Sequence, residues 1–151
     1  VYREEKSCIK PAVFPKKYCN GLAELALHQL KKLSILNAGR KEIAKHYFQA
    51  FEQTDYSLPN KTGSAVYLRF NILTKKADEL RFQAKKTGMV LGNWYKNVID
   101  PQGVDLVKAG YIKGSCPQAE KAAAGSLNLP TYPSLTKNQV NQIITFLNSI
   151  N

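Results

Sequence analysis

The chain has 151 residues, 44% of them hydrophobic, which is enough for one domain with its own core. Its formal net charge of +11 favours acidic partners, such as nucleic acid, phosphate-bearing metabolites or an acidic protein surface. No apolar run reaches the ~18 residues that a membrane-spanning helix needs, and no secretory signal peptide is recognisable. We therefore expect a cytoplasmic protein without a membrane partner.

The N-terminal third predicts an extended segment followed by a long helix. Residues 1–19 contain two prolines and show no clear hydrophobic period, so we expect an extended lead-in. Asn20 is a suitable N-cap, and after it apolar residues recur at steps of three and four. This spacing predicts an amphipathic helix within residues 20–56, which Asn37 and Gly39 kink or divide.

The remainder, residues 57–151, predicts a small α+β domain with strands and helices in alternation. Strands are expected over 66–72, 89–95 and 126–129, the first with Val66, Leu68, Phe70 and Ile72 facing inward. A helix is expected between the first two strands, from a Thr74 cap to a stop at Gly88. Together with the long helix, the sequence predicts an α+β fold with a small, mostly antiparallel sheet covered by helices.

Two more helices are expected near the C-terminus, each opened by a capping box. Ser115 with Gln118 opens a short helix that Gly125 ends, and Thr136 with Gln139 opens the last one. Between the second strand and the first of these helices, residues 96–114 form a long irregular loop. Loops of this length inside a compact domain are usually functional or disordered.

The chain shows no recognisable catalytic site. His28 and His46 have no orienting partner in sequence, and Cys116 at a helix start has no nearby base, so we assign no catalytic residue. The three cysteines, Cys8, Cys19 and Cys116, lack metal-ligand spacing, and we expect reduced thiols and no metal. Trp94, Tyr95 and Tyr111 flank the long loop and form either a ligand wall or part of the core.

Three segments resemble the DegT/DnrJ/EryC1/StrS family of PLP-dependent aminotransferases, and they follow one another in the family's order. Residues 20–47 resemble the helix between the family's two domains, with the pair Gln29-Leu30 followed by basic residues. Residues 74–95 resemble a helix and strand of the small domain. Residues 116–136, CPQAEKAAAGSLNLPTYPSLT, resemble its C-terminal signature of Cys-Pro, Ala-Glu and Leu-Pro.

This resemblance implies the C-terminal part of an enzyme that acts on nucleotide-linked keto-sugars. The fold would be the small C-terminal domain of fold type I aminotransferases, preceded by the interdomain helix. In the family, a large N-terminal domain supplies the Schiff-base lysine, the carboxylate at the pyridine nitrogen and most phosphate contacts. No residue here matches those motifs. The resemblance therefore implies PLP in the full-length enzyme, but no cofactor and no activity for these residues alone.

The resemblance also suggests site residues and partners. Lys17 falls where an Arg often contacts the cofactor phosphate of the partner subunit, although Pro15 replaces a common Asn. Trp94, Tyr95 and Asn97 fall on the loop that faces substrate in the family. The expected partners are a large PLP-binding domain or a second subunit, and a nucleotide-sugar.

A different reading of the charge is a stand-alone basic binding module for nucleic acid or another acidic partner, without catalysis. The basic residues, however, are scattered in pairs, and no recognition helix or aromatic RNA-binding strand is recognisable. A third reading is a domain that completes an enzyme in trans.

Overall fold

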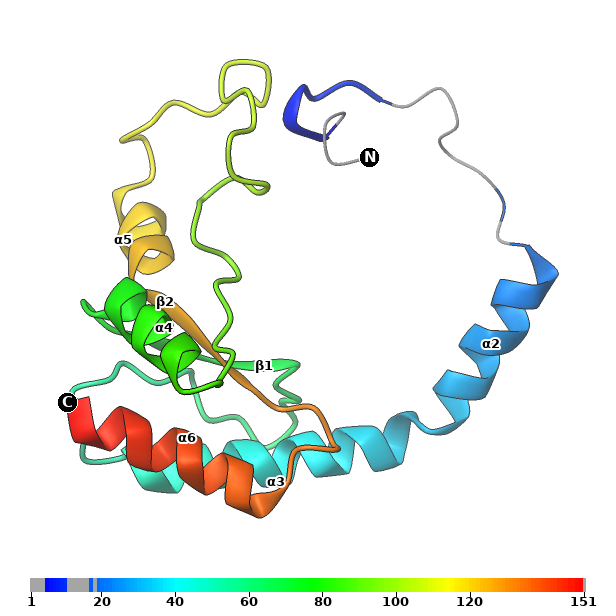
Figure 1. Ribbon diagram of the computed structural model, residues 1–151. Coiled ribbons are helices and arrows are strands. Elements are labelled where there is room, and N and C mark those ends of the chain that lie inside the picture. The colour runs from blue at the N-terminus through cyan, green and yellow to red at the C-terminus, as the bar shows by residue number, and fades with distance from the viewer. Residues whose placement is uncertain (1–4, 11–16, 18, 151) are drawn as a thin grey trace. The chain divides into compact units, whose positions relative to one another are not determined.

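The computed structural model describes residues 5–10, 17 and 19–150 (Figure 1). The chain folds into two compact units. The described residues within 1–30 and 95–124 form the loop unit, and those within 31–94 and 125–151 form the sheet unit. The helices are α2 (Asn20–Lys31), α3 (Leu33–Phe51), α4 (Ala77–Lys86), α5 (Pro117–Gly125) and α6 (Lys137–Ile150). The strands are β1 (Arg69–Leu73) and β2 (Ser126–Pro130).

The sheet unit is built around an antiparallel pair of strands. β1 and β2 pair in the register that places Asn71 opposite Asn128 and Phe70 opposite Leu129. Isolated bridges add Ser57 beside Leu73 and Gly92 beside Asn128. The expected α+β class and the antiparallel pairing are thus confirmed, but the predicted strand over 89–95 is wrong because it is reduced to the single bridge at Gly92.

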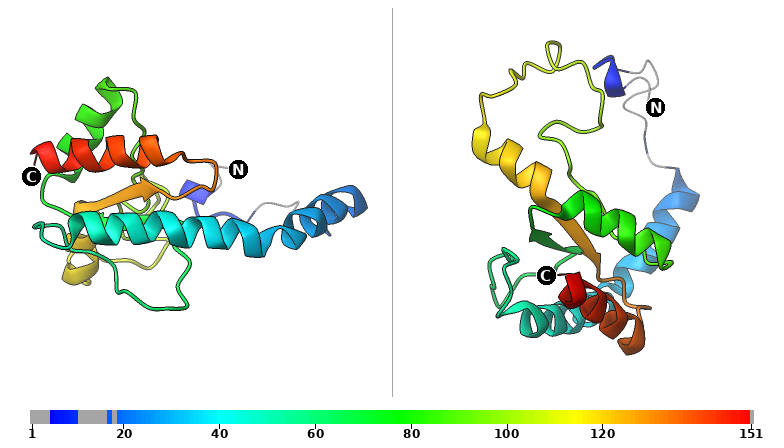
Figure 2. Two further views of the ribbon diagram at one scale, coloured as in Figure 1. Left: turned by 90° about the horizontal axis from the view of Figure 1, so that it is seen from below. Right: turned by 60° about the vertical axis from the view of Figure 1, so that its left-hand side comes forward.

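Helices cover one face of this strand pair (Figure 2). On that face, four side chains that alternate along the strands are completely buried: Phe70, Ile72, Leu127 and Leu129. α4 packs against β2, and α6 packs against both α3 and α4. Buried aromatic rings of α3, Tyr47 and Phe51, complete the core. Since each fully buried large apolar side chain contributes about 1.5–3 kcal/mol, this core provides the main stabilisation of the sheet unit.

The first strand begins later than its alternating pattern predicts. Leu68 is 65% exposed, and β1 starts only at Arg69. The Thr131 hydroxyl lies 2.7 Å from the carbonyl oxygen of Tyr67 and 2.8 Å from that of Leu68, and Arg40 donates to the Leu68 carbonyl at 3.1 Å. Side chains therefore occupy these carbonyls, and the inward placement predicted for Val66 and Leu68 is wrong.

The long helix is interrupted at Lys32, between α2 and α3, and not at Asn37 or Gly39. Gly39 lies inside α3 close to Pro133, and an added Cβ atom would lie 3.3 Å from the Pro133 Cβ. This glycine therefore permits a close approach of the segment before α6 and does not break the helix. Among the described helices, none is both long and apolar enough to cross a membrane.

Of the two predicted capping boxes, the structure has one. The backbone N–H of Thr136 donates to the Gln139 side chain at 2.9 Å, and the N–H of Gln139 lies 3.2 Å from the Thr136 hydroxyl oxygen. The box at Ser115 is wrong, because α5 begins at Pro117 and the Cys116 carbonyl accepts the N–H of Glu120. The Ser115 hydroxyl instead lies 3.9 Å from the Cys116 sulfur.

Candidate functional site

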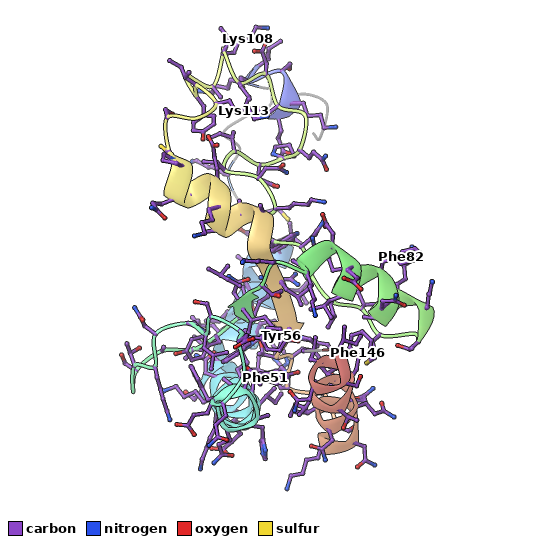
Figure 3. The ribbon with its side chains drawn as sticks, turned by 90° about the vertical axis from the view of Figure 1, so that its left-hand side faces the viewer. Phe51, Tyr56, Phe82, Lys108, Lys113 and Phe146 are labelled. Atoms are coloured by element: carbon purple, nitrogen blue, oxygen red, sulfur yellow. The ribbon has the colours of Figure 1, made fainter. Side chains whose placement is uncertain are left out.

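The loop that precedes α5 is a succession of hydrogen-bonded turns. The N–H of Val104 donates to Pro101, that of Gly110 to Val107, and that of Ser115 to Ile112, at 3.0–3.1 Å. Lys113 lies in the last of these turns, next to α5, in the side-chain view of Figure 3. These local bonds give the predicted irregular loop a defined conformation without a strand or helix.

The loop and α5 border an open cavity of about 370 Å³ within the loop unit, which we call the loop cavity. This volume lies at the lower end of the range for small-molecule sites. Its walls combine apolar groups from Val98 to Ala123 with five polar side chains, which are Lys96, Asn97, Tyr111, Lys113 and Glu120. Such a mixture of apolar walls and a few convergent polar groups is typical of a site for a polar metabolite.

One carboxylate organises the polar side of the cavity. Oε1 of Glu120 accepts hydrogen bonds from the Tyr111 hydroxyl and from the backbone N–H of Gly114, each at 2.5 Å. Gly114 reaches this position with a φ of +92°, a conformation that favours glycine. The Tyr111 hydroxyl and the Gly114 N–H both lower the pKa of Glu120, which keeps this carboxylate ionised at neutral pH.

The same contact shifts the ionisation of Tyr111 to higher pH. Its hydrogen bond to Glu120 raises the pKa of Tyr111 from 10.0 to about 12. Because the folded-state pKa is raised, the pair favours the folded loop below pH 10, and this contribution disappears as the pH rises through about 12. At the acid end, the lowered pKa of Glu120 means that the contribution is present above pH 4.5 and is lost as the pH falls below it.

We predict that Glu120→Gln moves the ionisation of one tyrosine to lower pH. The uncharged amide still accepts a hydrogen bond but no longer disfavours the phenolate, so the pKa of Tyr111 falls from about 12 towards 10.0. Phenolate absorbance measured during an alkaline titration checks this, and Tyr111→Phe identifies the tyrosine involved. Identical titration curves for the wild type and Glu120→Gln would contradict the contact.

The structure distributes the predicted substrate residues over both units. Asn97 is half-buried and lines the loop cavity, and Tyr95 belongs to the same unit with 57% of its surface exposed. Trp94 belongs to the sheet unit, where it is 51% exposed and the Arg69 guanidinium lies over its ring at 4.0 Å. The predicted phosphate ligand, Lys17, is exposed, while Pro15 lies outside the described residues.

Sequence reasoning missed the pairing of Tyr111 with Glu120. The two residues are nine positions apart, which matches neither a helical nor a strand spacing. The available signal was that Glu120 is the sole carboxylate between Gly114 and Thr136. A single carboxylate next to a long loop is a candidate acceptor for hydrogen bonds from the N–H and O–H groups of that loop.

The residues considered for catalysis do not converge. His28 is exposed on α2, and His46 is exposed on α3. Cys116, at the start of α5, is an exposed free thiol, and so are Cys8 and Cys19. Among the residues that the structure describes, no group of three His, Cys, Asp or Glu side chains has the geometry of a metal site. In the loop cavity, Oε1 of Glu120 already accepts hydrogen bonds from two donors.

Comparison with known proteins identifies the class of the chain. A model of the DegT/DnrJ/EryC1/StrS aminotransferase family matches residues 16–148. The chain therefore belongs to this family, as its three motifs predicted.

Individual proteins are similar to this chain in sequence or in fold. A pleiotropic regulatory protein of Geobacillus stearothermophilus is 33% identical over 79 residues, which are 52% of this chain and 21% of that protein. NtdA from Bacillus subtilis, solved with bound PMP, has a TM-score of 0.73 at 21% identity over 99% of this chain and 38% of its own. The sugar aminotransferase CalS13 from Micromonospora echinospora has a TM-score of 0.68 at 12% identity, over 82% and 33% of the two chains. The two solved structures show a shared fold.

The chain spans only part of its relatives. It covers 21% of the length of the Geobacillus stearothermophilus protein and 35% of the length of a second curated relative, from Methanocaldococcus jannaschii. The loop cavity does not fit the part of a PLP-holding site. Its lysines, Lys96 and Lys113, lie in no motif of the family's Schiff-base lysine, and its carboxylate already accepts from Tyr111 and Gly114. We therefore assign none of the residues that line this cavity to the cofactor.

Proposed function

We propose that these residues are the C-terminal segment of a PLP-dependent aminotransferase that acts on a nucleotide-linked sugar. In this proposal, the loop over 96–114 binds the substrate, and α2 with α3 forms the helical region between the two domains. The observation that carries it is the family match over residues 16–148, together with a defined cavity in the loop that faces substrate in this family. A cytoplasmic location is part of the proposal, since the three cysteines are exposed free thiols.

The polar lining of the loop cavity suits a sugar attached to a diphosphate. The Asn97 amide can both donate to and accept from sugar hydroxyls, whereas the ammonium groups of Lys96 and Lys113 favour phosphate oxygens. Glu120 is the one carboxylate among the residues that line the cavity, so its single negative charge offsets only one of the two lysine charges. The cavity therefore has a cationic surplus that matches the charge of the proposed ligand.

Trp94, Tyr95 and Lys17 enter the proposal as residues with separate roles. Trp94 and Tyr95 offer exposed aromatic surface to the sugar, and the resemblance to the family supports their place on the substrate side. Lys17 would contact the cofactor phosphate of a second subunit, and its exposed side chain is compatible with that role. The large PLP-binding domain and the second subunit are accordingly the proposed macromolecular partners.

The proposal requires that this chain alone cannot hold the cofactor in a reactive form. When the chain is mixed with PLP, we expect no saturable absorbance band of a lysine-bound cofactor, beyond the weak, linear signal that exposed lysines give. A stable band at one equivalent would contradict the proposal, because it would reveal a specific PLP lysine within these residues.

We predict that Lys113→Ala weakens binding of UDP-glucose, used as a probe, more than Lys108→Ala does. Both lysines lie on the same loop and carry the same charge (Figure 3), but Lys113 lines the cavity and Lys108 pairs with Asp105 at 3.7 Å. Losing one partly exposed ion pair of about 0.5–1 kcal/mol corresponds to a decrease in affinity of about two- to fivefold.

Calorimetric or NMR titration of the two variants and the wild type measures this difference. Equal losses in both variants, growing steeply at low salt, would favour binding through net charge and hence the alternative of a basic binding module. A gel-shift titration with RNA would then examine that alternative directly.

A further inference from the structure

The exposed tryptophan of the sheet unit is held by a buried polar network. Asn128, at the centre of β2, is only 3% exposed. Its Oδ1 atom accepts the backbone N–H of Trp94 at 2.6 Å, and its Nδ2 atom donates to Oδ1 of Asn71 at 2.8 Å. One side chain therefore links both strands to the backbone of Trp94.

Ser126 completes the network from the other end of β2. Its hydroxyl oxygen lies 2.8 Å from Oδ1 of Asn71 and 3.5 Å from the carbonyl oxygen of Trp94. Among the described residues, no buried side-chain nitrogen or oxygen lacks a partner. A satisfied buried network of this kind is rigid, because breaking any one bond leaves a buried polar group without a partner.

The backbone two residues earlier is fixed to the same asparagine. The N–H of Gly92 donates to the Asn128 carbonyl at 2.8 Å, and the N–H of Asn128 donates to the Gly92 carbonyl at 3.1 Å. Asn128 therefore binds Gly92 through its backbone N–H and carbonyl groups, and it binds the backbone N–H of Trp94 through its side chain. Together these bonds set where the backbone of Trp94 lies.

The indole ring has its own support. Arg69 shares a strand face with Asn71, and its guanidinium carbon lies 4.0 Å from the centroid of the Trp94 ring. A guanidinium stacked on an indole restricts the rotation of the ring and covers one of its faces. Half of the Trp94 surface nevertheless remains exposed, beside a groove of about 660 Å³ that both side chains line.

We propose that Asn128 and Arg69 are positioning residues that hold Trp94 in a preset orientation for contact with the sugar ring of the substrate. This inference rests on the proposed function, in which Trp94 faces the sugar. Asn128 fixes the backbone, Arg69 fixes the ring, and neither residue needs to touch the ligand. Preorganising an aromatic surface in this way reduces the ordering cost of binding.

The first test uses the fact that Trp94 is the sole tryptophan of the chain. Arg69→Met removes the stacked cation at an exposed position and leaves the core intact. We expect the ring to leave its packed orientation about two- to fivefold more often, seen as lower time-resolved fluorescence anisotropy and faster acrylamide quenching. Lys86→Met is the matched control, since it removes a cation stacked on Phe82 in the same unit.

Asn128→Ala tests the backbone half of the proposal, with Asn141→Ala on the exposed face of α6 as its control. We expect greater mobility of Trp94 in Asn128→Ala alone, under conditions where circular dichroism shows both variants folded. If Asn128→Ala does not fold, Arg69→Met still decides the role of the stacked cation. Unchanged anisotropy in Arg69→Met would overturn the proposal.

The second test measures binding of UDP-glucose to the same variants. We expect Arg69→Met to weaken the binding in the same direction as Trp94→Ala but by a smaller factor, and Lys86→Met to have no effect. If Trp94→Ala itself leaves binding unchanged while the fluorescence differences are present, the proposed function of Trp94 is wrong, and its fixed orientation stands. If Arg69→Met frees the ring without weakening binding that depends on Trp94, the positioning role is overturned.

Discussion

Phe70→Ala is expected to lower the free energy of unfolding of the sheet unit by about 3–5 kcal/mol, the usual cost of truncating a buried phenylalanine. Phe70 is completely buried on β1. Its ring centroid lies 5.4 Å from that of Tyr47, 4.8 Å from that of Phe48 and 5.6 Å from that of Tyr67. Because these rings come from both α3 and the segment before β1, alanine would leave a cavity that no single neighbour can fill.

Denaturant unfolding followed by the fluorescence of Trp94 measures this loss, since that residue belongs to the sheet unit. Phe82→Ala is the matched control. Phe82 lies on α4 (Figure 3). Because 60% of its surface is exposed and Lys86 lies over its ring, we expect a loss below about 1 kcal/mol. Equal losses in the two variants would contradict the placement of Phe70 in the core.

The parts of the fold that the sequence predicted well are those that local spacing determines. The final helix is an example, because Thr136 and Gln139 form their capping box within three residues and Val140, Ile143 and Leu147 are buried as their spacing indicates. Strand β2 was also predicted, since its apolar residues stand directly between Gly125 and Pro130. No long-range contact is needed to recognise either element.

The errors arise where a distant side chain replaces a backbone partner. The expected strand over 89–95 stops after one bridge, because the next N–H that points towards β2, that of Trp94, donates to the Asn128 side chain and not to a backbone carbonyl. Likewise, the predicted strand start at Val66 fails where Thr131 and Arg40 occupy carbonyls before β1. Such contacts join residues more than 25 positions apart, and no local pattern reports them.

In the candidate site, too, local sequence patterns predicted some features and long-range contacts determined others. The resemblance to the family identified the loop, and with it Asn97, but not the pairing of Tyr111 with Glu120 that shapes the loop cavity. The positions of Trp94 and Asn97 also follow different causes, since a buried network fixes the first and local turns fix the loop that carries the second. Motifs thus indicated the candidate segment, and three-dimensional contacts defined the geometry of its side chains.

Among the glycines of the chain, Gly92 is the one whose added Cβ atom would lie nearest to another residue. A Cβ atom at Gly92 would lie 3.0 Å from the Cβ of Asn128, 3.2 Å from Nη1 of Arg69 and 3.3 Å from Oδ1 of Asn128. The exposed Arg69 can move aside, but Asn128 is buried and hydrogen-bonded at both ends of its amide. We therefore expect Gly92→Ala to cost about 1–3 kcal/mol of stability, as overpacking usually does.

The same substitution should alter Trp94 before the unit unfolds. Moving Asn128 lengthens its bond to the Trp94 N–H, and moving Arg69 uncovers the ring, so we expect lower anisotropy in the folded variant. Gly63→Ala is the matched control, because no atom lies within 4 Å of its added Cβ. If Gly92→Ala lowers stability but leaves the anisotropy of Trp94 at the wild-type value, Gly92 is a packing residue only. A change in both quantities shows that one close backbone approach supports the strand pair and the aromatic surface together.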